Sequence, residues 1–192
     1  MISGFSGRKD DIWYSIVIDD KGKLVACAFS DKSLRETRKA VVNSLPVTIR
    51  NPLQWQHANA KDLRTLVTFY EGKGRKTDLR AVDLTAVSRF RRGVYNLLCK
   101  IPLGRVTTYG ALAEKMGGRR YSRAVGTAVA TNPLPLIIPC HRVVPWSLKV
   151  GNYGMCGRNP GRGGYMKRKL LQREGVRFEG DRVSKQSIWI PS

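Results

Sequence analysis

Three helix patterns, each closed by a strong stop signal, are the feature that most constrains how this chain can fold. Within residues 83–102, apolar side chains recur at the spacing of one helical face, and a proline ends the run. Within residues 107–118, a threonine cap opens a short helical run that stops at two glycines. A third run lies within residues 121–133, with Ser122 as its expected N-cap and Asn-Pro as its stop. Two short helices joined by a tight turn, behind a longer helix, predict a helix-turn-helix.

The third predicted helix is slim, because small side chains recur along it. They are Ala124, Gly126, Ala128 and Ala130. A slim helix could pack tightly inside the protein, or it could bring its backbone close to a DNA groove. Three arginines at its start favour DNA: Arg119, Arg120 and Arg123.

The first part of the chain predicts a small α/β unit. Residues 11–30 form two β-rich runs around a DKGK turn, which is typical of a hairpin. Residues 33–45 then predict a helix that Ser33 would cap, with a glutamate three positions later. A polar segment at 71–80 marks the expected boundary. The expected parts are an N-terminal α/β domain of structural or unclear role (residues 1–80), a helix-turn-helix domain (81–178) and a C-terminal tail (179–192).

The net charge of +21 is concentrated in the second half of the chain. Residues 86–175 hold 17 basic and 2 acidic side chains, a net of +15, whereas residues 1–85 hold 15 basic and 10 acidic, a net of +5. A generally basic protein from a basic proteome is one explanation. A nucleic-acid partner is favoured, because so little acid is interspersed in the basic half.

Several other classes of protein are disfavoured. No run of about 18–20 apolar residues is present in the sequence, so no membrane span is expected, and residues 1–4 do not open a secretory signal. The four cysteines are Cys27, Cys99, Cys140 and Cys156. They are widely spaced and only two histidines accompany them, so we expect neither a metal site nor a disulfide framework, although one disulfide stays open.

The chemistry-bearing segment is PLIIPCHRVVP, residues 135–145. We expect residues 136–138 to form an apolar strand that delivers Cys140 beside His141, with Arg142 next. A free thiol has a pKa near ~8.5, so a reactive cysteine needs a base, a cation or a helix N-terminus. Neighbours in an extended segment point opposite ways, so His141 needs a turn or a bridging water to act on the thiol. A lone buried cysteine is usually inert, but its histidine, arginine and proline neighbours favour a nucleophile.

A cysteine protease is one alternative for this pair. A protease needs a third group that orients the histidine, and Glu174 is a candidate. A strongly basic surface has no use in a protease, and no peptide-binding feature is visible in the sequence.

Motifs around the cysteine resemble the O6-alkylguanine-DNA alkyltransferase family. The segment NPLPLIIPCHRVV (132–144) is similar to the active-site segment of that family. Four further motifs follow the family order: IPLGRVTTYGALA, SRAVGTAVATNP, VGNY and KLLQREG. The resemblance covers residues 86–178, about half of the chain. It implies an α/β fold in which a small, ribonuclease-H-like N-terminal domain precedes a mostly helical, winged helix-turn-helix domain.

The resemblance implies a single-use methyltransferase that repairs DNA by direct damage reversal and needs no cofactor. Cys140 would take the alkyl group from O6 of guanine irreversibly, with O4-alkylthymine left open as a second substrate. His141 and Glu174 would ionise the thiol through a water. Tyr109 would press on the DNA backbone and donate a proton toward the flipped guanine, which must leave the base stack to react.

The resemblance also implies which residues meet the DNA and the base. Arg123 would fill the gap left in the base stack, and Asn132 would tie the helix-turn-helix to the active-site segment. The residues implied to contact DNA are Tyr109, Ser122, Arg123, Ala124, Gly126, Thr127 and Arg142. Those implied to line the base pocket are Asn132, Pro135, Val143, Tyr153 and Gly154. The implied partner is double-stranded DNA containing alkylated guanine, bound by a monomer in the cytoplasm at the nucleoid, or in the nucleus of a eukaryote, and not at a membrane.

The chain departs from the family pattern in two places. Where a glycine-containing turn is expected, residues 146–149 read Trp-Ser-Leu-Lys. The loop at 154–164, rich in glycine and arginine, is longer than usual and carries Cys156.

Two further interpretations stay open. An alkyltransferase-like protein has this fold without the nucleophile, binds lesions and recruits excision repair, and the presence of Cys140 argues against it. A basic winged-helix DNA-binding protein with an inert core cysteine is the other.

Overall fold

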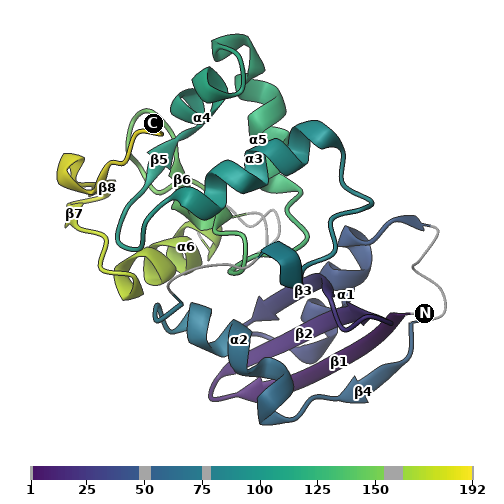
Figure 1. Cartoon of the computed structure of the whole chain (residues 1–192). Helices are drawn as coiled ribbons and strands as arrows, with labels where there is room; N and C mark the ends of the chain where they lie inside the picture. The colour runs from purple at the N-terminus through teal and green to yellow at the C-terminus, as the bar shows by residue number, and fades with distance from the viewer. Residues whose placement is uncertain (1, 48–52, 75–78, 154–161, 192) are drawn as a thin grey trace.

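A four-stranded sheet organises the N-terminal half in the computed structural model, which describes residues 2–47, 53–74, 79–153 and 162–191 (Figure 1). The strands are β1 (Ile2–Lys9), β2 (Ile12–Asp19), β3 (Leu24–Ser30) and β4 (Trp55–His57). Their order across the sheet is β3-β2-β1-β4, with the first three antiparallel and β4 parallel to β1. The chain therefore crosses over after β3 and returns at the opposite edge.

Alternating side chains along β2 allow both faces of the sheet to be covered. On one face, Val17 packs with Val41 of α1 (Leu34–Ser44). On the other face the side chains of β2 that join the main core are Ile12, Tyr14 and Ile16. That core continues through α2 (Ala60–Tyr70) into the C-terminal half, so the sheet supports the second half of the molecule.

The predicted hairpin at 11–30 and the helix at 33–45 are confirmed as β2–β3 and α1. Ser33 caps α1, and its side chain accepts a hydrogen bond from the backbone N–H of Glu36. The sequence did not predict β1, whose serines and glycines hide the alternation, nor α2. The signal for α2 was a capping box, in which Asn59 and Asp62 each accept a hydrogen bond from the backbone of the other.

The C-terminal half is mainly helical, as expected. Its helices are α3 (Arg89–Lys100), α4 (Tyr109–Lys115), α5 (Ser122–Ala130) and α6 (Arg162–Arg173), with short 3₁₀ turns at Leu79–Ala81, Arg119–Tyr121, Cys140–Arg142 and Lys185–Ser187. Two strand pairs complete it: parallel β5 (Thr107–Thr108) with β6 (Val143–Val144), and antiparallel β7 (Phe178–Glu179) with β8 (Arg182–Val183). No helix in the described residues is long and apolar enough to cross a membrane.

Two local predictions in this half are wrong. Ser122 does not cap α5, because the preceding 3₁₀ turn leads directly into the helix and its hydroxyl donates to the carbonyl of Arg119 instead. Residues 136–138 form a turn rather than a strand: Leu136 has a φ of 72°, and the N–H of Ile138 donates to the carbonyl of Leu134 at 2.8 Å.

The C-terminal segment lies against the short parallel strand pair (Figure 1). Val106, just before β5, forms a parallel bridge with Ile188. The backbone N–H of Val183 donates to the carbonyl of Leu148 at 2.9 Å. A small core of five buried side chains seals the contact: Val106, Val144, Leu171, Val176 and Val183.

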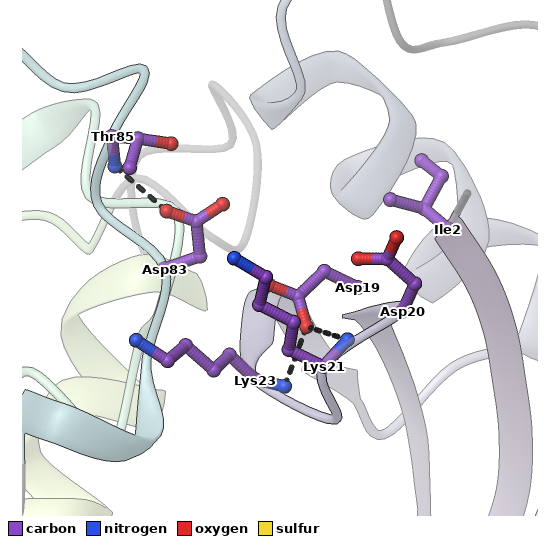
Figure 2. A pocket seen from close by; sticks show the side chains of 7 residues that line it. All are labelled: Ile2, Asp19, Asp20, Lys21, Lys23, Asp83 and Thr85. Carbon is purple, nitrogen blue, oxygen red and sulfur yellow. Dashed lines mark hydrogen bonds between the residues drawn. The ribbon is translucent and has the colours of Figure 1, made fainter.

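A polar pocket lies between the β2–β3 turn and the segment before α3 (Figure 2). It is lined by Ile2, Asp19, Asp20, Lys21, Lys23, Asp83 and Thr85. The carboxylate of Asp19 accepts from the backbone N–H groups of Lys21 and Lys23, and that of Asp83 accepts from Thr85. These two acids therefore stabilise turns.

The close packing of α2 against the end of α6 predicts a large effect at Gly72. It has a φ of +75°, and an added Cβ would overlap the carbonyl oxygen of Arg173. Gly72→Ala should lower the free energy of unfolding by about 2–4 kcal/mol, measured by urea unfolding. Gly22→Ala is the control, because Gly22 has a similar φ of +74° in open space and should lose only about 1 kcal/mol. Equal losses in the two variants would contradict the close contact.

Candidate active site

Cys140 opens a one-turn 3₁₀ helix at the end of the turn that follows α5. Pro139 has a φ of −79° and a ψ of 62°, and the backbone N–H of Cys140 donates to the carbonyl of Ile138 at 2.7 Å. This is an inverse γ-turn, which changes the chain direction just before the cysteine. The 3₁₀ turn at Cys140–Arg142 that follows supplies the change of direction that the sequence required between Cys140 and His141.

The thiol of Cys140 is buried and has polar neighbours on two sides. The side-chain amide of Asn132 donates to Sγ at 3.1 Å, and the hydroxyl of Tyr153 lies 3.9 Å from Sγ. Asn132 also donates to the carbonyl of Ile138 at 2.8 Å, while its own oxygen accepts from the N–H of Leu134 at 3.0 Å. One amide just beyond α5 thus holds both the turn and its cysteine.

His141 and Glu174 form a buried pair behind the cysteine. His141 Nε2 lies 2.9 Å from Glu174 Oε1, and both side chains are at most 3% exposed. A carboxylate can only accept a hydrogen bond, so Nε2 carries the hydrogen in this contact. His141 Nδ1 is buried without a hydrogen-bond partner among the described residues, so it is the ring nitrogen left to exchange a proton with a bridging water.

Arg142 completes this pair from inside the protein. Its Nε and Nη2 each donate to an oxygen of Glu174 at 2.8 Å, and its Nη1 donates to the carbonyl of Ile101 at 2.8 Å. The predicted contact of Arg142 with DNA is therefore wrong, because this guanidinium is buried and its donors are engaged. In the structure, Arg142 instead fixes the carboxylate of Glu174, which in turn binds His141.

Burial alone would raise the pKa of Glu174. The charge and hydrogen bond of His141, and then those of Arg142, outweigh it and lower that pKa to about 2. The carboxylate is therefore ionised throughout the range in which proteins are stable.

Lys167 is a functional candidate that the sequence analysis missed. It lies in α6, seven residues before Glu174 and so on the same face of the helix. Its side chain is almost fully buried, and Nζ donates to the carbonyl of Val143 at 2.6 Å. Within the described residues it has no ion pair, and the spacing to Glu174 was the only signal in the sequence that could have revealed it.

Opposing effects set the protonation of the thiol. Burial raises the pKa of Cys140, and the hydrogen bonds of Asn132 and Tyr153 and the charge of Lys167 only partly offset it. The thiol is therefore protonated at pH 7 in this state. Burial also lowers the pKa of Lys167 to about 8, while a charge on Cys140 would raise it. The two groups thus favour each other's charged forms.

Tyr109 and the residues of α5 are the predicted contacts with DNA. Tyr109 is the first residue of α4; burial raises the pKa of its phenol, and a charge on Cys140 would raise it further, so the hydroxyl keeps its proton. The outer side of α5 exposes Arg123, Ala124 and Thr127. Gly126 and Ser122 are partly exposed. Three buried side chains hold the inner side: Val125, Ala128 and Val129.

α3 fixes the C-terminal end of α5. Arg91 donates to the carbonyl of Thr131 at 2.6 Å and to the hydroxyl of Tyr95 at 2.9 Å. That hydroxyl in turn donates to the carbonyl of Ala128 at 3.1 Å. The exposed helix α5 is therefore fixed to α3 at the end from which the chain continues to Asn132.

The sheet holds the same turn from behind. The backbone N–H of Cys27 donates to the carbonyl of Pro133 at 2.9 Å, and its thiol donates to that of Pro135 at 3.2 Å. Pro135, Val143 and Tyr153 are all buried around the turn. Gly154 and Cys156 lie outside the described residues, as does most of the predicted 154–164 loop. In the described residues no cluster of three or more His, Cys, Asp and Glu could hold a metal ion.

Comparison with known proteins identifies the family. Residues 89–176 match a family model described as the 6-O-methylguanine DNA methyltransferase, DNA binding domain. A methylated-DNA–protein-cysteine methyltransferase of Thermococcus gammatolerans is 33% identical over 176 residues, which cover 91% of this chain and 94% of that protein. The chain belongs to this methyltransferase family.

Other members agree with this assignment. A methyltransferase of the same name from Methanothermobacter thermautotrophicus is 34% identical over 121 residues, covering 62% of this chain and 63% of the relative. The crystal structure of the Mycobacterium tuberculosis O6-methylguanine methyltransferase superposes with a TM-score of 0.67 and 25% identity, over 94% of this chain and 97% of that one. The mixed α/β fold and the family resemblance are confirmed.

The pKa of Glu174 predicts a specific acid sensitivity. A lowered pKa stabilises the fold above the ordinary value of 4.5, and this contribution is lost as the pH falls toward 2. Glu174→Gln should lower the free energy of unfolding by about 3 kcal/mol at pH 7, and its stability should decline less than that of the unsubstituted protein between pH 4.5 and pH 2.

Glu114→Gln is the matched control, because Glu114 forms an exposed ion pair with Arg119 at 3.0 Å. This variant should stay within about 1 kcal/mol of the unsubstituted protein. Urea unfolding over a pH series measures both variants. Identical pH profiles for Glu174→Gln and the unsubstituted protein would contradict the assigned ion pair.

Proposed function

We propose that this protein repairs DNA by direct damage reversal, moving the alkyl group of an O6-alkylguanine in double-stranded DNA to Sγ of Cys140. The observation that carries the proposal is the buried thiol beside the His141–Glu174 pair, in a chain of the methylated-DNA–protein-cysteine methyltransferase family. The family model is that of a DNA-binding domain, and the basic half of the chain suits a polyanion.

The reaction is a single displacement in which atoms and charges balance. An Sγ–carbon bond forms while the bond between that carbon and guanine O6 breaks, and the electron pair stays on the purine. The thiol proton passes through a water to His141 Nδ1, Tyr109 donates a proton to the leaving guanine, and the proton held by His141 then returns through solvent to the phenolate of Tyr109. The net result is a thioether on Cys140 and an unmodified guanine. Since a thioether does not revert to a thiol, each molecule acts once.

Lys167 supports the ionised thiol. Arg142 and Glu174 already neutralise each other, so the ammonium of Lys167 is the buried charge left to balance a thiolate at Cys140. Holding the thiol neutral until a lesion is bound limits side reactions, because the thiolate is the reactive form.

The DNA-binding surface is a helix-turn-helix built from α4 and α5, which we assign to a winged domain at residues 81–178. Arg123 enters the base stack in place of the flipped nucleotide, and the small, exposed Ala124 and Thr127 let α5 approach the groove. Extruding the base costs a few kcal/mol, which phosphate contacts offset. Residues 1–80 form a ribonuclease-H-like domain that supports the active-site turn, and residues 179–192 form a C-terminal tail that packs against β5 and β6.

An alkyltransferase-like protein that only recruits excision repair is not favoured, because the nucleophile is present. The repair protein acts as a monomer, and its substrate assigns it to the cytoplasm at the nucleoid, or to the nucleus of a eukaryote. Asn132, Pro135, Val143 and Tyr153 surround the flipped base. O4-alkylthymine is a second candidate substrate.

The transfer itself is tested with a duplex that carries radiolabelled O6-methylguanine. One label per protein molecule should become bound and stay bound through denaturation. Cys140→Ala should abolish transfer while keeping the affinity for the duplex, because the thiol is not a DNA contact. Lesion binding without transfer by the unsubstituted protein would contradict the proposal.

The role of Lys167 predicts a change in thiol reactivity. Lys167→Met should raise the pKa of Cys140 and slow methyl transfer at pH 7 by at least about tenfold, because one pKa unit corresponds to about 1.4 kcal/mol. The pH dependence of Cys140 alkylation by iodoacetamide measures that pKa. Lys167→Arg retains the charge and should restore part of the reactivity. An unchanged pH profile in Lys167→Met would show that the ammonium does not act on the thiol.

A further inference from the structure

We propose that Trp146 is an additional DNA contact of this protein, held beside the helix-turn-helix by the C-terminal segment. The proposal rests on the proposed function, since it assigns a further part of the surface to the same DNA. It concerns the Trp-Ser-Leu-Lys turn at residues 146–149, where the sequence departs from the glycine-containing turn expected for the family.

The exposure of Trp146 is the first observation. Its side chain is 89% exposed, more than that of any other large apolar residue in the described chain. Tryptophan is a highly buried residue type on average, and it is enriched at binding interfaces. Ile190 and Tyr165 are also exposed, at 74% and 61%, but neither offers an indole.

The turn that carries Trp146 is fixed on both sides. The N–H of Leu148 donates to the carbonyl of Pro145 at 2.9 Å, which closes the turn, and the carbonyl of Leu148 accepts from the N–H of Val183 at 2.9 Å. Lys149 Nζ forms an ion pair with Asp181 at 3.3 Å. The indole is therefore displayed on an ordered support, which limits the entropy lost when it binds.

That support comes from a part of the chain beyond the matched family model. The match to the family model ends at residue 176, and the β7–β8 hairpin that holds the turn follows that residue. Leu148 and Phe178 pack against the small core that joins this hairpin to β5 and β6. The unusual turn and the segment that braces it thus form one structural unit.

The strand register locates this unit near the DNA-facing helices. β5 and β6 are parallel, with Thr108 opposite Val144, so both strands leave the pair at the same end. β5 continues directly into Tyr109 and α4, while β6 continues through Pro145 to Trp146. Strands lie about 4.8 Å apart and consecutive Cα atoms about 3.8 Å apart, so the Cα atoms of Trp146 and Tyr109 are no more than about 16 Å apart.

The charge around the turn selects a polyanion as partner. Lys149 and Arg182 form an antiparallel bridge, and their side chains are 58% and 60% exposed. Asp181, the acid between them, is ion-paired with both, at 3.3 Å to Lys149 and 4.0 Å to Arg182, so the three side chains together keep one positive charge. An exposed indole among cations suits DNA, where an aromatic ring can stack on a base or pack on a sugar beside the cationic phosphate contacts.

The test compares DNA affinity in Trp146→Ala, Trp146→Phe and Ile190→Ala. Fluorescence anisotropy with labelled duplexes, with and without O6-methylguanine, gives Kd for each variant. Trp146→Ala should raise Kd about tenfold, because stacking contributes about 1–3 kcal/mol per base and 1.4 kcal/mol is a factor of ten. Trp146→Phe should lose less, and the exposed control Ile190→Ala should stay within about twofold.

Two further measurements separate stacking from other effects. The slope of log affinity against log salt should be the same in Trp146→Ala, because no cation is removed. Intrinsic fluorescence should be quenched by the duplex in the unsubstituted protein, and most of that quenching should be lost in Trp146→Phe. An unchanged Kd in Trp146→Ala would overturn the proposal. A change confined to self-association, seen by sedimentation, would overturn it in favour of a second copy of the chain as partner.

The failure of the proposed function would look different. Transfer from free O6-benzylguanine, whose benzylic carbon is a good electrophile, tests Cys140 without DNA. Absence of that transfer in the unsubstituted protein would count against the enzyme, whatever Trp146 does. If transfer from the free base is intact, the ratio of the transfer rate on subsaturating duplex to the rate on the free base should be about tenfold lower in Trp146→Ala than in the unsubstituted protein. The same ratio in both proteins would count against Trp146 alone.

Discussion

The buried carboxylate of Glu174 is the interaction on which the rest of the site depends. It accepts two hydrogen bonds from Arg142 and one from His141, all between 2.8 and 2.9 Å. Without the carboxylate, the buried guanidinium of Arg142 would lack its counter-charge. An unpaired charge costs far more free energy when it is buried than when it is exposed. The same carboxylate accepts the hydrogen carried by Nε2 of His141. One group therefore contributes both to the stability of the fold and to the arrangement of the site.

A second constraint connects the two halves of the molecule at the turn that carries Cys140. Asn132 binds the turn from the end of α5, while Cys27 of β3 binds the same turn from the sheet. The N-terminal half therefore contributes to the site, because β3 binds the segment that carries Cys140. The turn depends on this double support, since Leu136 adopts a φ of 72° that a leucine rarely adopts alone.

The sequence predicted features that depend on local chemistry. The caps at Ser33 and Thr108 and the stop at Gly117 and Gly118 depend only on neighbouring residues, so the sequence predicted the helices α1 and α4 that they bound. The order of motifs around Cys140 was sufficient to predict the family.

Features that depend on distant partners were missed. Arg142 was expected to contact DNA because no residue near it in the sequence indicates that it pairs with Glu174, 32 residues away. Lys167 was overlooked because lysines are almost always exposed, and its burial depends on α6 packing against the active-site turn. The strand expected at 136–138 failed because its direction is set by Pro139 and Asn132 rather than by its apolar character.

In the proposed reaction, one buried thiol receives the alkyl group and keeps it. Peptide mass mapping of the protein after incubation with excess duplex carrying O6-methylguanine tests this most directly. We expect a single methyl group on the peptide that contains Cys140, at one equivalent per protein, with the peptides of Cys27, Cys99 and Cys156 unmodified. A methyl group on another residue, or repair of several equivalents of DNA by each molecule, would contradict it.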